Sequence, residues 1–251
     1  MLKGLLKQMN SIEKVWRKFI FDVLENGEKH IKDDGDVLYE HMINQAFITN
    51  VVGDLGLVAS SNVNSKMFLE MIGKGAFNIE DYPIKDEALR SYVEQLDQEE
   101  QIYLERYEDS FVYTYPERIF NIYEVDKFGE VRGINQFDVV CDRLREHYGS
   151  NRAVATLYIA GLDQDEQHIP CLQWFQCTIR NDELILHIMF RSNDLYSAFP
   201  SNMLFLNYLG LKFEEELRKD YPMLRFKGIN YNSTSLHIYE GDVEQARNVI
   251  G

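Results

Sequence analysis

The chain has 251 residues, of which 45% are hydrophobic and 27% are charged, a balance typical of a globular protein with a sizeable core. The formal net charge of -15 argues against a nucleic-acid polymer or an anionic membrane surface as the main partner, because both would repel the chain. A nucleotide is compatible with this charge, since a small phosphate needs only a local basic pocket. With five prolines and no Ser/Gly-rich tract, we expect a single domain over residues 1–251.

The three cysteines, Cys141, Cys171 and Cys177, are odd in number and lack CxxC spacing, so we expect neither a metal site nor a disulfide framework. Free thiols fit a reducing compartment. The first ten residues, MLKGLLKQMN, lack the apolar core and cleavage site of a signal peptide, and no run in the chain approaches membrane-spanning length. We therefore expect a cytoplasmic location and no membrane partner.

The N-terminal part of the chain opens with a helical pattern over residues 11–26. Ser11 can cap this helix, and its apolar positions form one stripe: Ile12, Val15, Trp16, Phe19, Ile20, Val23 and Leu24. A turn around residues 33–36 precedes an expected strand from Gln45 to Val52. From Lys66 to Glu108 the pattern is mostly helical.

The C-terminal part alternates helical and strand patterns. In chain order we expect a helix from Asn135 to Tyr148, a strand from Ala153 to Ile159, a helix after Pro200 through Arg218, a strand from Ile229 to Tyr239, and a terminal helix to Ile250 capped by Asp242. The first of these helices turns four side chains inward: Phe137, Val140, Cys141 and Leu144. Strands mixed with long helices indicate a sheet layered with helices.

The stretch from Pro170 to Asn202 predicts a strand, a tight turn at residues 180–183, a buried return strand over Leu184–Phe190, and a polar loop that leads into a helix. Strict alternation would put Leu172 on one face of the first strand and four residues on the other: Cys171, Gln173, Phe175 and Cys177. Four polar residues follow the return strand: Arg191, Ser192, Asn193 and Asp194. Such a hairpin can hold a thiol near a guanidinium and a hydroxyl, which suits a nucleophile that acts on an anionic substrate.

Each candidate residue also has an ordinary structural interpretation. Cys171 could be a small buried thiol in a strand. Arg191 and Ser192 could form a surface turn with a salt bridge instead of a phosphate site. Asn202 could cap a helix instead of offering its donor and acceptor to a ligand. His237 could be a buried structural histidine.

Short motifs along the chain occur in the order and approximate spacing of the thymidylate synthase and pyrimidine hydroxymethylase superfamily: Tyr113–Arg118, Ser150–Val154, Pro170-Cys171, Arg191-Ser192-x-Asp194, Pro200-x-Asn202 and His237-x-Tyr239. The chain most resembles the short archaeal-type and phage-type members, over roughly Tyr113 to Glu240, whereas residues 1–110 match weakly. The resemblance implies an α/β (α+β) fold with a mixed, bent β-sheet layered with helices. It also implies a homodimer in which two sheets pair back to back.

The resemblance implies a role for each motif residue. Cys171 would be the nucleophile that adds to carbon 6 of a uracil ring, with Arg191 and Tyr115 as further catalytic residues. Substrate-binding residues would surround a pyrimidine nucleotide such as dUMP: Arg152, reaching across the dimer, and Ser192 at the phosphate, Asn202 at the uracil edge, and His237 and Tyr239 at the sugar 3'-hydroxyl. Asp194 would contact the pterin ring of the co-substrate, 5,10-methylene-tetrahydrofolate or a related pterin.

The chain departs from the family pattern at several places. Residues 32–35, Lys-Asp-Asp-Gly, stand where longer members have an Arg-Thr-Gly phosphate loop, and Asn151 replaces the first of two adjacent arginines. Leu172 and Phe190 replace a histidine and a glutamine beside the catalytic motifs. Only twelve residues follow Tyr239, too few for the tail that closes over folate in longer members. The family's water-ordering glutamate has no secure counterpart; one candidate is Glu94.

These observations leave three hypotheses. The first is transfer of a one-carbon unit to carbon 5 of dUMP in the manner of thymidylate synthase. The second is a hydroxymethylase that acts on dUMP or another pyrimidine nucleotide. The third belongs to another class, a non-catalytic relative that binds a nucleotide.

Overall fold

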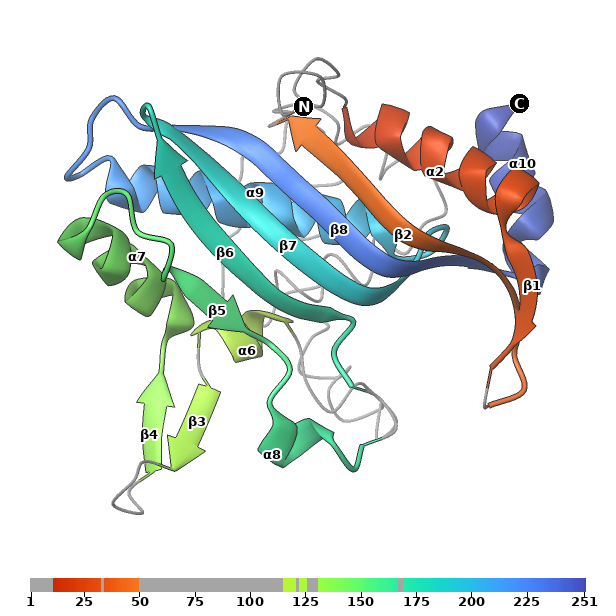
Figure 1. Ribbon diagram of the computed structural model, residues 1–251, viewed down its shortest axis with the longest axis horizontal. Coiled ribbons are helices and arrows are strands. Elements are labelled where there is room, and N and C mark those ends of the chain that lie inside the picture. Colours follow the sequence, from red (N-terminus) through yellow and green to blue (C-terminus); the bar gives the residue numbers. More distant parts are fainter. Residues whose placement is uncertain (1–10, 33, 50–114, 121, 126–130, 167–168) are drawn as a thin grey trace, which may run out of the picture.

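The computed structural model describes residues 11–32, 34–49, 115–120, 122–125, 131–166 and 169–251 (Figure 1). Six strands form one sheet in the order β1-β2-β8-β7-β6-β5, and two more form a separate ribbon. The bounds are β1 Glu28–Ile31, β2 Val37–Thr49, β5 Val154–Thr156, β6 Leu172–Arg180, β7 Glu183–Asp194 and β8 Arg225–Tyr239, with β3 Ile122–Val125 and β4 Val131–Ile134 in the ribbon.

One strand pair of the large sheet is parallel and the others are antiparallel. The parallel pair is β7 and β8, which helix α9 (Phe199–Leu217) connects. The strands curve strongly (Figure 1), and the register of the sheet shifts within both the β6–β7 and the β7–β8 pairs. The fold is therefore α/β, with a mixed, bent sheet layered with helices, as the sequence predicts.

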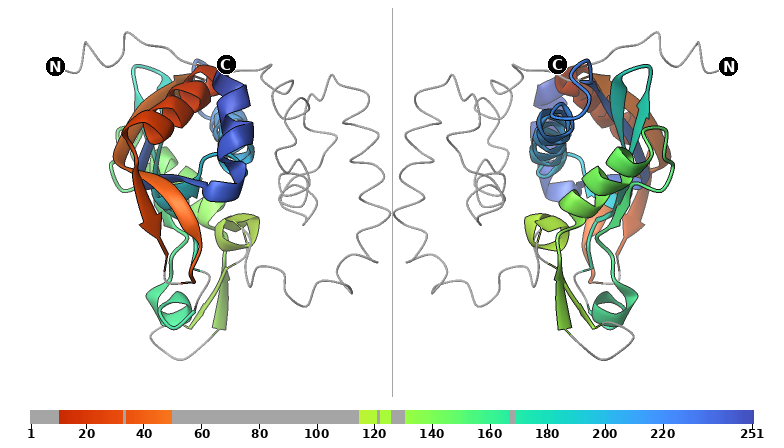
Figure 2. Two further views of the ribbon diagram at one scale, coloured as in Figure 1. Left: turned by 90° about the vertical axis from the view of Figure 1, so that its right-hand side faces the viewer. Right: turned by 90° about the vertical axis from the view of Figure 1, so that its left-hand side faces the viewer.

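Helix α9 packs along β7 and β8, and two further helices flank it. These are α2 (Ile12–Asn26), which also contacts β2, and α7 (Gln136–Glu146), which also contacts β6. The edge-on views of Figure 2 show α9 and the terminal helix α10 (Val243–Ile250), both blue, on one side of the strands. The short helical segments are α6 Tyr115–Phe120, α8 Ala160–Asp163 and the 3-10 turn Glu240–Asp242. Among the described residues, no helix is both long and apolar enough to cross a membrane.

Helix α2 begins and ends close to its predicted bounds. The side chain of Ser11 accepts a hydrogen bond from the backbone N–H of Lys14 at 3.2 Å, which confirms the predicted cap. The predicted apolar stripe faces the sheet. Within it, Trp16 donates its indole N–H to the carbonyl oxygen of Leu195 at 2.6 Å, so α2 is tied to the loop that follows β7. The predictions of α7, with its four inward side chains, and of α9 are also confirmed.

The hairpin of β6 and β7 turns at Asn181 and Asp182, whose φ angles of 52° and 60° give the two-residue turn that fits the twist of the strands. The predicted alternation is wrong at the start of β6. A register shift between Leu172 and Trp174 marks a bulge there, and Leu172 turns fully into the core. Cys171, immediately before the bulge, is only partly buried against the core.

Strand β5 is shorter than predicted. It covers Val154–Thr156, whereas the sequence pattern predicts a strand over 153–159. The bulge in the neighbouring strand explains the difference, because the N–H groups of Leu157 and Tyr158 both donate to the one carbonyl oxygen of Gln173. Regular pairing cannot continue past that point.

Strand β2 begins at Val37, well before the predicted start at Gln45. Its first half mixes apolar and polar side chains, most of them partly exposed, and pairs with the end of β8, so its own pattern of hydrophobicity is weak. Asp242 occupies the position before α10, but its side chain makes no capping hydrogen bond, and that detail of the prediction is wrong. The helical pattern predicted for residues 66–108 lies outside the described residues.

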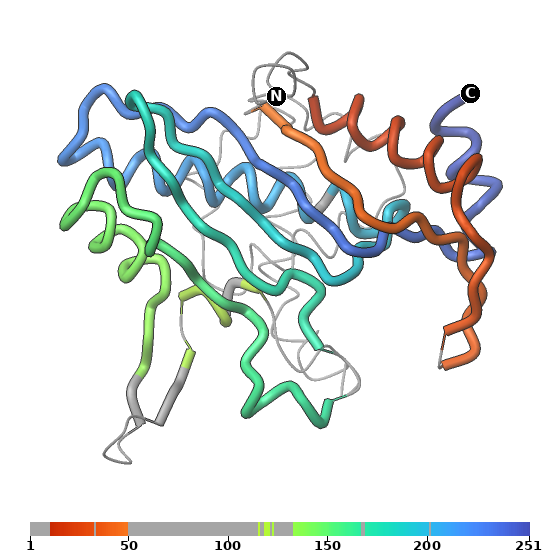
Figure 3. The backbone as a smooth tube through the Cα atoms, in the orientation of Figure 1, coloured from red at the N-terminus to blue at the C-terminus, as the bar shows by residue number. Residues whose placement is uncertain are grey.

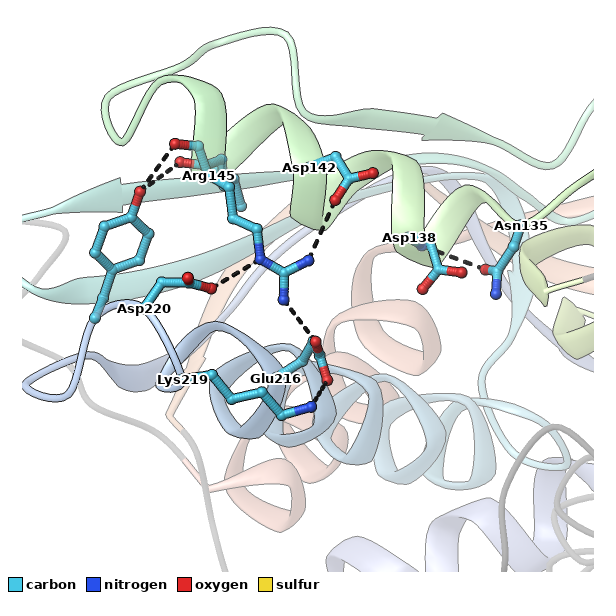
Figure 4. A network of polar contacts seen from close by, with 9 residues as sticks. Asn135, Asp138, Asp142, Arg145, Glu216, Lys219 and Asp220 are labelled. Atoms are coloured by element: carbon cyan, nitrogen blue, oxygen red, sulfur yellow. Dashed lines mark hydrogen bonds and ion pairs between the residues drawn. The ribbon is translucent and has the colours of Figure 1, made fainter.

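The C-terminal ends of α7 and α9 are joined by a polar cluster around Arg145 (Figure 4). Its guanidinium donates to Asp220 at 2.8 Å, to Asp142 at 3.2 Å and to Glu216, which also pairs with Lys219. The hydrogen bonds to Asp220 and Glu216 raise the pKa of Arg145 above its usual value. This cluster fixes the two helices to each other at the end of the molecule that carries the β6–β7 turn.

The face of the sheet opposite α9 carries partly exposed side chains from β5 to β8. Trp174 is 37% exposed and Val154 is also exposed, although both lie on strands of the large sheet. Between them and β8, the two ring nitrogens of His187 lie within hydrogen-bond distance of Thr178, at 2.8 Å, and of Asn230, at 3.0 Å. Burial lowers the pKa of His187, so this line of polar contacts is uncharged at neutral pH.

Candidate active site

The topology of the sheet gathers most of the candidate residues at one edge. Because β7 and β8 are parallel, their carboxyl ends meet there, and ligands of such sheets commonly bind beyond the carboxyl ends of the strands. The register places Ser192 opposite Ser235 and Asp194 opposite His237. The amino ends of β2 and β6, which are antiparallel to their neighbours, and the first turn of α9 lie at the same edge.

The thiol of Cys171 lies beside a hydroxyl that is itself bound to a cation. Its Sγ is 3.7 Å from Oγ of Ser192, and Nη1 of Arg191 donates to the same Oγ at 3.0 Å. The structure therefore brings together the three residues that the hairpin predicts. The guanidinium reaches the thiol through the hydroxyl of Ser192.

Arg191 also fixes the chain immediately before Cys171. Its Nε donates to the carbonyl oxygen of Pro170 at 3.1 Å, and its Nη2 donates to that of Ile169 at 2.8 Å. With the bond to Ser192, these contacts use three of the five N–H groups of a guanidinium. Two N–H groups remain for an anion such as a phosphate.

Tyr115 supports the same segment from α6. Its side chain is largely buried, and its hydroxyl oxygen accepts a hydrogen bond from the backbone N–H of Leu172 at 3.2 Å. The ring lies near that of Phe205 on α9, with centroids 6.5 Å apart. Tyr115 is thus in contact with the residue that follows Cys171.

His237 and Tyr239 point to the same side of β8, and their rings meet edge to face with centroids 5.2 Å apart. Burial lowers the pKa of His237 to about 4, so its imidazole is neutral at pH 7 and can accept or donate a hydrogen bond. Opposite His237 on β2 lies Glu40, whose carboxylate accepts a hydrogen bond from Ser235. Burial also raises the pKa of Tyr239, which keeps its phenol protonated.

The segment that replaces the family's phosphate loop still brings a cation to this edge. The Nζ of Lys32 lies 3.4 Å from the hydroxyl of Tyr239 and 5.4 Å from the centre of its ring. The ammonium of Lys32 forms ion pairs with the carboxylates of Asp34 and Asp36, and its Nζ lies 3.8 Å from Oδ2 of Asp36. Lys32 is thus a partly neutralised cation beside the residue predicted to bind the sugar.

Asn202 does not cap α9. The position before the helix is Ala198, and Asn202 lies within the first turn, 2% exposed. Its Nδ2 donates to Oδ1 of Asn193 at 3.1 Å, whereas its Oδ1 is buried without a hydrogen-bond partner in the described structure. A buried acceptor without a partner costs about 1–3 kcal/mol, so it marks a place where a ligand donor would be favourable.

Asp194 has a structural role in the loop before α9. Its Oδ1 accepts hydrogen bonds from the backbone N–H groups of Tyr196 and Ser197, each at 3.0 Å, and so shapes the loop before α9. Burial raises the pKa of the Asp194 carboxyl above its ordinary value. Its proposed contact with a pterin stays a prediction.

The structure does not bring Arg152 to the other candidates within one chain. The neighbouring Ala153 pairs with Cys177, so Arg152 lies level with Thr178, seven residues along β6 from Cys171 and about 20 Å away. Its side chain is exposed. Arg180, at the end of β6, donates to the side chain of Asn151 at 2.7 Å, so a second guanidinium lies beside the residue that precedes Arg152.

The other two cysteines are structural. Burial raises the pKa of Cys141 to about 12, and it raises that of Cys177 well above the usual value. Neither lies near Cys171 in the pattern of strands. Within the described ranges, no group of three or more His, Cys, Asp and Glu side chains could hold a metal ion.

Part of this site has no local signal in the sequence. Glu40 and Lys32 enter through the pairing of β2 with β8, which no local pattern indicates. Tyr231 contacts Asn193 from the middle of β8 and looks like an ordinary core aromatic in the sequence. Asn193 had one signal, its place between the motif residues Ser192 and Asp194. The candidate Glu94 lies outside the described residues.

A partly buried thiol, a guanidinium and an amide thus lie at the carboxyl ends of the strands of a bent, mixed sheet, as the sequence motifs predict. The chain belongs to the thymidylate synthase family, whose profile, described as "Thymidylate synthase", matches residues 16–251.

Similar proteins come from methanogenic archaea, and each is named "Putative thymidylate synthase". The protein of Methanocaldococcus jannaschii is 32% identical over 165 residues, which cover 64% of this chain and 67% of the relative. The proteins of Methanopyrus kandleri and Methanothermobacter marburgensis are 27% and 25% identical, and each match covers 96% of both chains. The similarity therefore extends over the N-terminal part as well as the motif-bearing part.

Proposed function

We propose that this protein transfers a one-carbon unit from 5,10-methylene-tetrahydrofolate, or a related pterin, to carbon 5 of dUMP. The observation that carries the proposal is the contact of the Cys171 thiol with Ser192, which Arg191 holds, at the edge where the ends of β7 and β8 meet. A buried structural thiol needs neither neighbour. Membership of the thymidylate synthase family supports a one-carbon transferase in general.

The chemistry begins at Cys171. Its thiolate forms a C–S bond to carbon 6 of the uracil, and the electron pair of the C5–C6 double bond moves to carbon 5. Carbon 5 then bonds to the methylene group of the pterin, and the bond from this carbon to one of its two pterin nitrogens breaks. Loss of the carbon 5 proton breaks the bond to the second nitrogen, so the ring carries an exocyclic methylene and the tetrahydropterin is released from it. Hydride from the tetrahydropterin, or water, then adds to the methylene carbon, the C5–C6 double bond re-forms and the Cys171 thiolate departs from carbon 6. Hydride gives a methyl product and a dihydropterin, whereas water gives a hydroxymethyl product and leaves the tetrahydropterin.

The remaining residues bind and orient the nucleotide. The two free N–H groups of Arg191 and the hydroxyl of Ser192 suit the phosphate. The neutral imidazole of His237 and the phenol of Tyr239 suit the sugar 3'-hydroxyl. Asn202 suits the base, because its buried carbonyl oxygen lacks a donor.

A homodimer is part of the proposal. Back-to-back pairing would cover the sheet face that exposes Trp174 and Val154. It would also give a role to Arg152, which lies about 20 Å along the strand from the thiol of its own chain. The described cysteines are free, which supports a reducing, cytoplasmic location.

The test is intact-protein mass spectrometry with 5-fluoro-deoxyuridylate, with and without methylene-tetrahydrofolate. Fluorine at carbon 5 cannot leave as a cation, so the reaction should stop at a covalent adduct that contains both ligands. We expect that adduct on the wild-type protein, and no adduct on Cys171→Ala, which should still bind the nucleotide.

Other outcomes discriminate among the hypotheses. Nucleotide binding without any adduct would favour a non-catalytic relative. With dUMP itself, the mass of the product separates methyl from hydroxymethyl transfer. A Cys171→Ala protein that still turned over would remove Cys171 from the mechanism.

A further inference from the structure

A chain of hydrogen bonds runs from Asn202 into the core. Nδ2 of Asn202 donates to Oδ1 of Asn193 at 3.1 Å, and Nδ2 of Asn193 donates to the hydroxyl oxygen of Tyr231 at 3.2 Å. Asn193 is 1% exposed and Tyr231 is fully buried. The side chain of Tyr231 is held by the rings of Phe190 and Phe199, at 5.7 and 5.4 Å between centroids.

The direction of this chain is given by its two hydrogen bonds. In each of them the side-chain N–H of an asparagine is the donor, and the acceptor is an oxygen: Oδ1 of Asn193 in the outer bond and the phenol oxygen of Tyr231 in the inner one. Tyr231 is therefore the acceptor at the inner end of the chain.

The orientation of both amides follows from this order of donors. Asn193 gives its N–H to Tyr231, so the oxygen of its amide faces Asn202. Asn202 must therefore donate its own N–H to that oxygen, and the carbonyl oxygen of Asn202 remains without a partner. If the chain ran the other way, the free group of Asn202 would be an N–H donor.

The free group decides which pyrimidine edge fits. Uracil carries an N–H at ring nitrogen 3, which pairs with a carbonyl oxygen. Cytosine carries a lone pair at the same nitrogen, which would oppose that oxygen and would need a donor instead. A buried acceptor that faces an acceptor loses its hydrogen bond and is penalised by desolvation.

We propose that Asn193 is a positioning residue which, held by Tyr231, turns the carbonyl oxygen of Asn202 toward the base and so selects uracil over cytosine. This inference rests on the proposed function, because it assumes that Asn202 contacts the base. Asn193 itself does so only through Asn202. Its position in the Arg191-Ser192-x-Asp194 motif makes it adjacent to two binding residues without being one of them.

The test compares the affinities of the full-length protein for dUMP and dCMP, measured by calorimetry. Tyr231→Phe keeps the ring and its aromatic contacts but removes the hydroxyl that orients Asn193. Asn193→Leu, of similar volume, removes the orienting amide altogether. We expect each variant to lower the dUMP-to-dCMP affinity ratio about tenfold or more, because either orientation of Asn202 becomes accessible.

A matched control is Tyr221→Phe, which removes a phenol that donates to the carbonyl oxygens of Leu144 and Arg145, at 3.0 and 3.3 Å, in the Arg145 cluster. It should leave the ratio unchanged. If Tyr231→Phe and Asn193→Leu weaken both nucleotides equally, the chain is merely structural and the inference is wrong. If the wild-type protein binds neither nucleotide, the proposed function fails and the inference fails with it.

Discussion

The sulfur of Cys171 and the hydroxyl oxygen of Ser192 lie 3.7 Å apart, across the paired strands β6 and β7. Because Arg191 donates to the same oxygen, one hydroxyl touches both the candidate nucleophile and the candidate anion site. The two parts of the site can therefore be separated by a substitution that removes only this oxygen.

Ser192→Ala should weaken dUMP binding about tenfold, since a hydrogen bond to a charged group contributes roughly 1.5–3 kcal/mol and the phosphate would lose one donor. The covalent adduct with 5-fluoro-deoxyuridylate should still form at saturating ligand, because Cys171 is intact. Calorimetry and intact mass measure the two effects. Tyr221→Phe, which removes a hydroxyl from the Arg145 cluster, is the control. An unchanged affinity for dUMP would exclude Ser192 from the phosphate site.

The free energy of unfolding should decrease as the pH is lowered through the range in which His237 titrates. Its folded pKa, about 4, lies below the ordinary value of 6.5, so between these values the unfolded state binds more protons than the folded state. The contribution of His237, about 3 kcal/mol, is therefore present above pH 6.5 and is lost as the pH falls toward 4. Urea unfolding of the wild type and of His237→Gln across this range should show a shallower pH dependence in the variant.

The raised pKa of Asp194 acts in the opposite sense and is common to both proteins, so it cancels in their difference. Parallel curves for the wild type and His237→Gln would show that the imidazole is not buried in its neutral form.

Lys32→Met should weaken dUMP binding severalfold, because the ammonium beside the hydroxyl of Tyr239 helps to hold that ring in place. It should also raise the pKa of His237 toward its usual value, since Lys32 is one of the cations that lower it. Calorimetry and NMR titration of the imidazole are the measurements. Lys29→Met in the same hairpin, where Lys29 pairs with Glu240, should change neither quantity.

Arg152 should act on the site of the second subunit. Arg152→Ala and Cys171→Ala should each be inactive as homodimers. Mixing equal amounts under conditions of subunit exchange should restore about a quarter of the wild-type activity, because half of the dimers then carry one intact site out of two. Native mass spectrometry should confirm that heterodimers have formed. If they form and no activity is recovered, Arg152 acts on the site of its own chain or has no role in activity.

Arg145→Met should lower the stability by about 1 kcal/mol, the scale expected for a partly exposed ion-pair network, and so lower Tm by roughly 2–4 °C. The matched control is Arg143→Met on the same helix, because Arg143 makes a single exposed pair with Glu146. Calorimetric melting of both variants measures the difference. Equal melting temperatures would mean that the Arg145 cluster joins α7 and α9 without stabilising them.

The sequence was sufficient to predict the elements that have a strong hydrophobic period or clear capping and turn residues at their ends. Helix α2 was predictable from its apolar stripe and from the cap at Ser11. The turn at Asn181 and Asp182 was predictable because polar residues separate two apolar strands. The candidate thiol, guanidinium and hydroxyl were predictable because they follow one another along a single hairpin. Such features are local, and local patterns determine them.

The features that the sequence did not predict depend on contacts between distant segments of the chain. The bulge at Leu172 is invisible to an alternation pattern, although it decides which side chain enters the core. The start of β2 at Val37 depends on its pairing with β8. The link from Asn193 to Tyr231 joins residues 38 positions apart, and nothing in either neighbourhood indicates it.

The parallel pairing of β7 with β8 also determines when the site can form. Antiparallel neighbours such as β6 and β7 can pair as soon as their turn is made, but a parallel partner must wait for the helix between them. On the ribosome, Cys171, Arg191 and Ser192 emerge first, on a hairpin that still lacks the strand carrying His237. The proposed nucleotide site is therefore completed only after β8 has been synthesised. A nascent chain that ends before β8 would carry Cys171 and Asn202 without Tyr231, His237 and Tyr239.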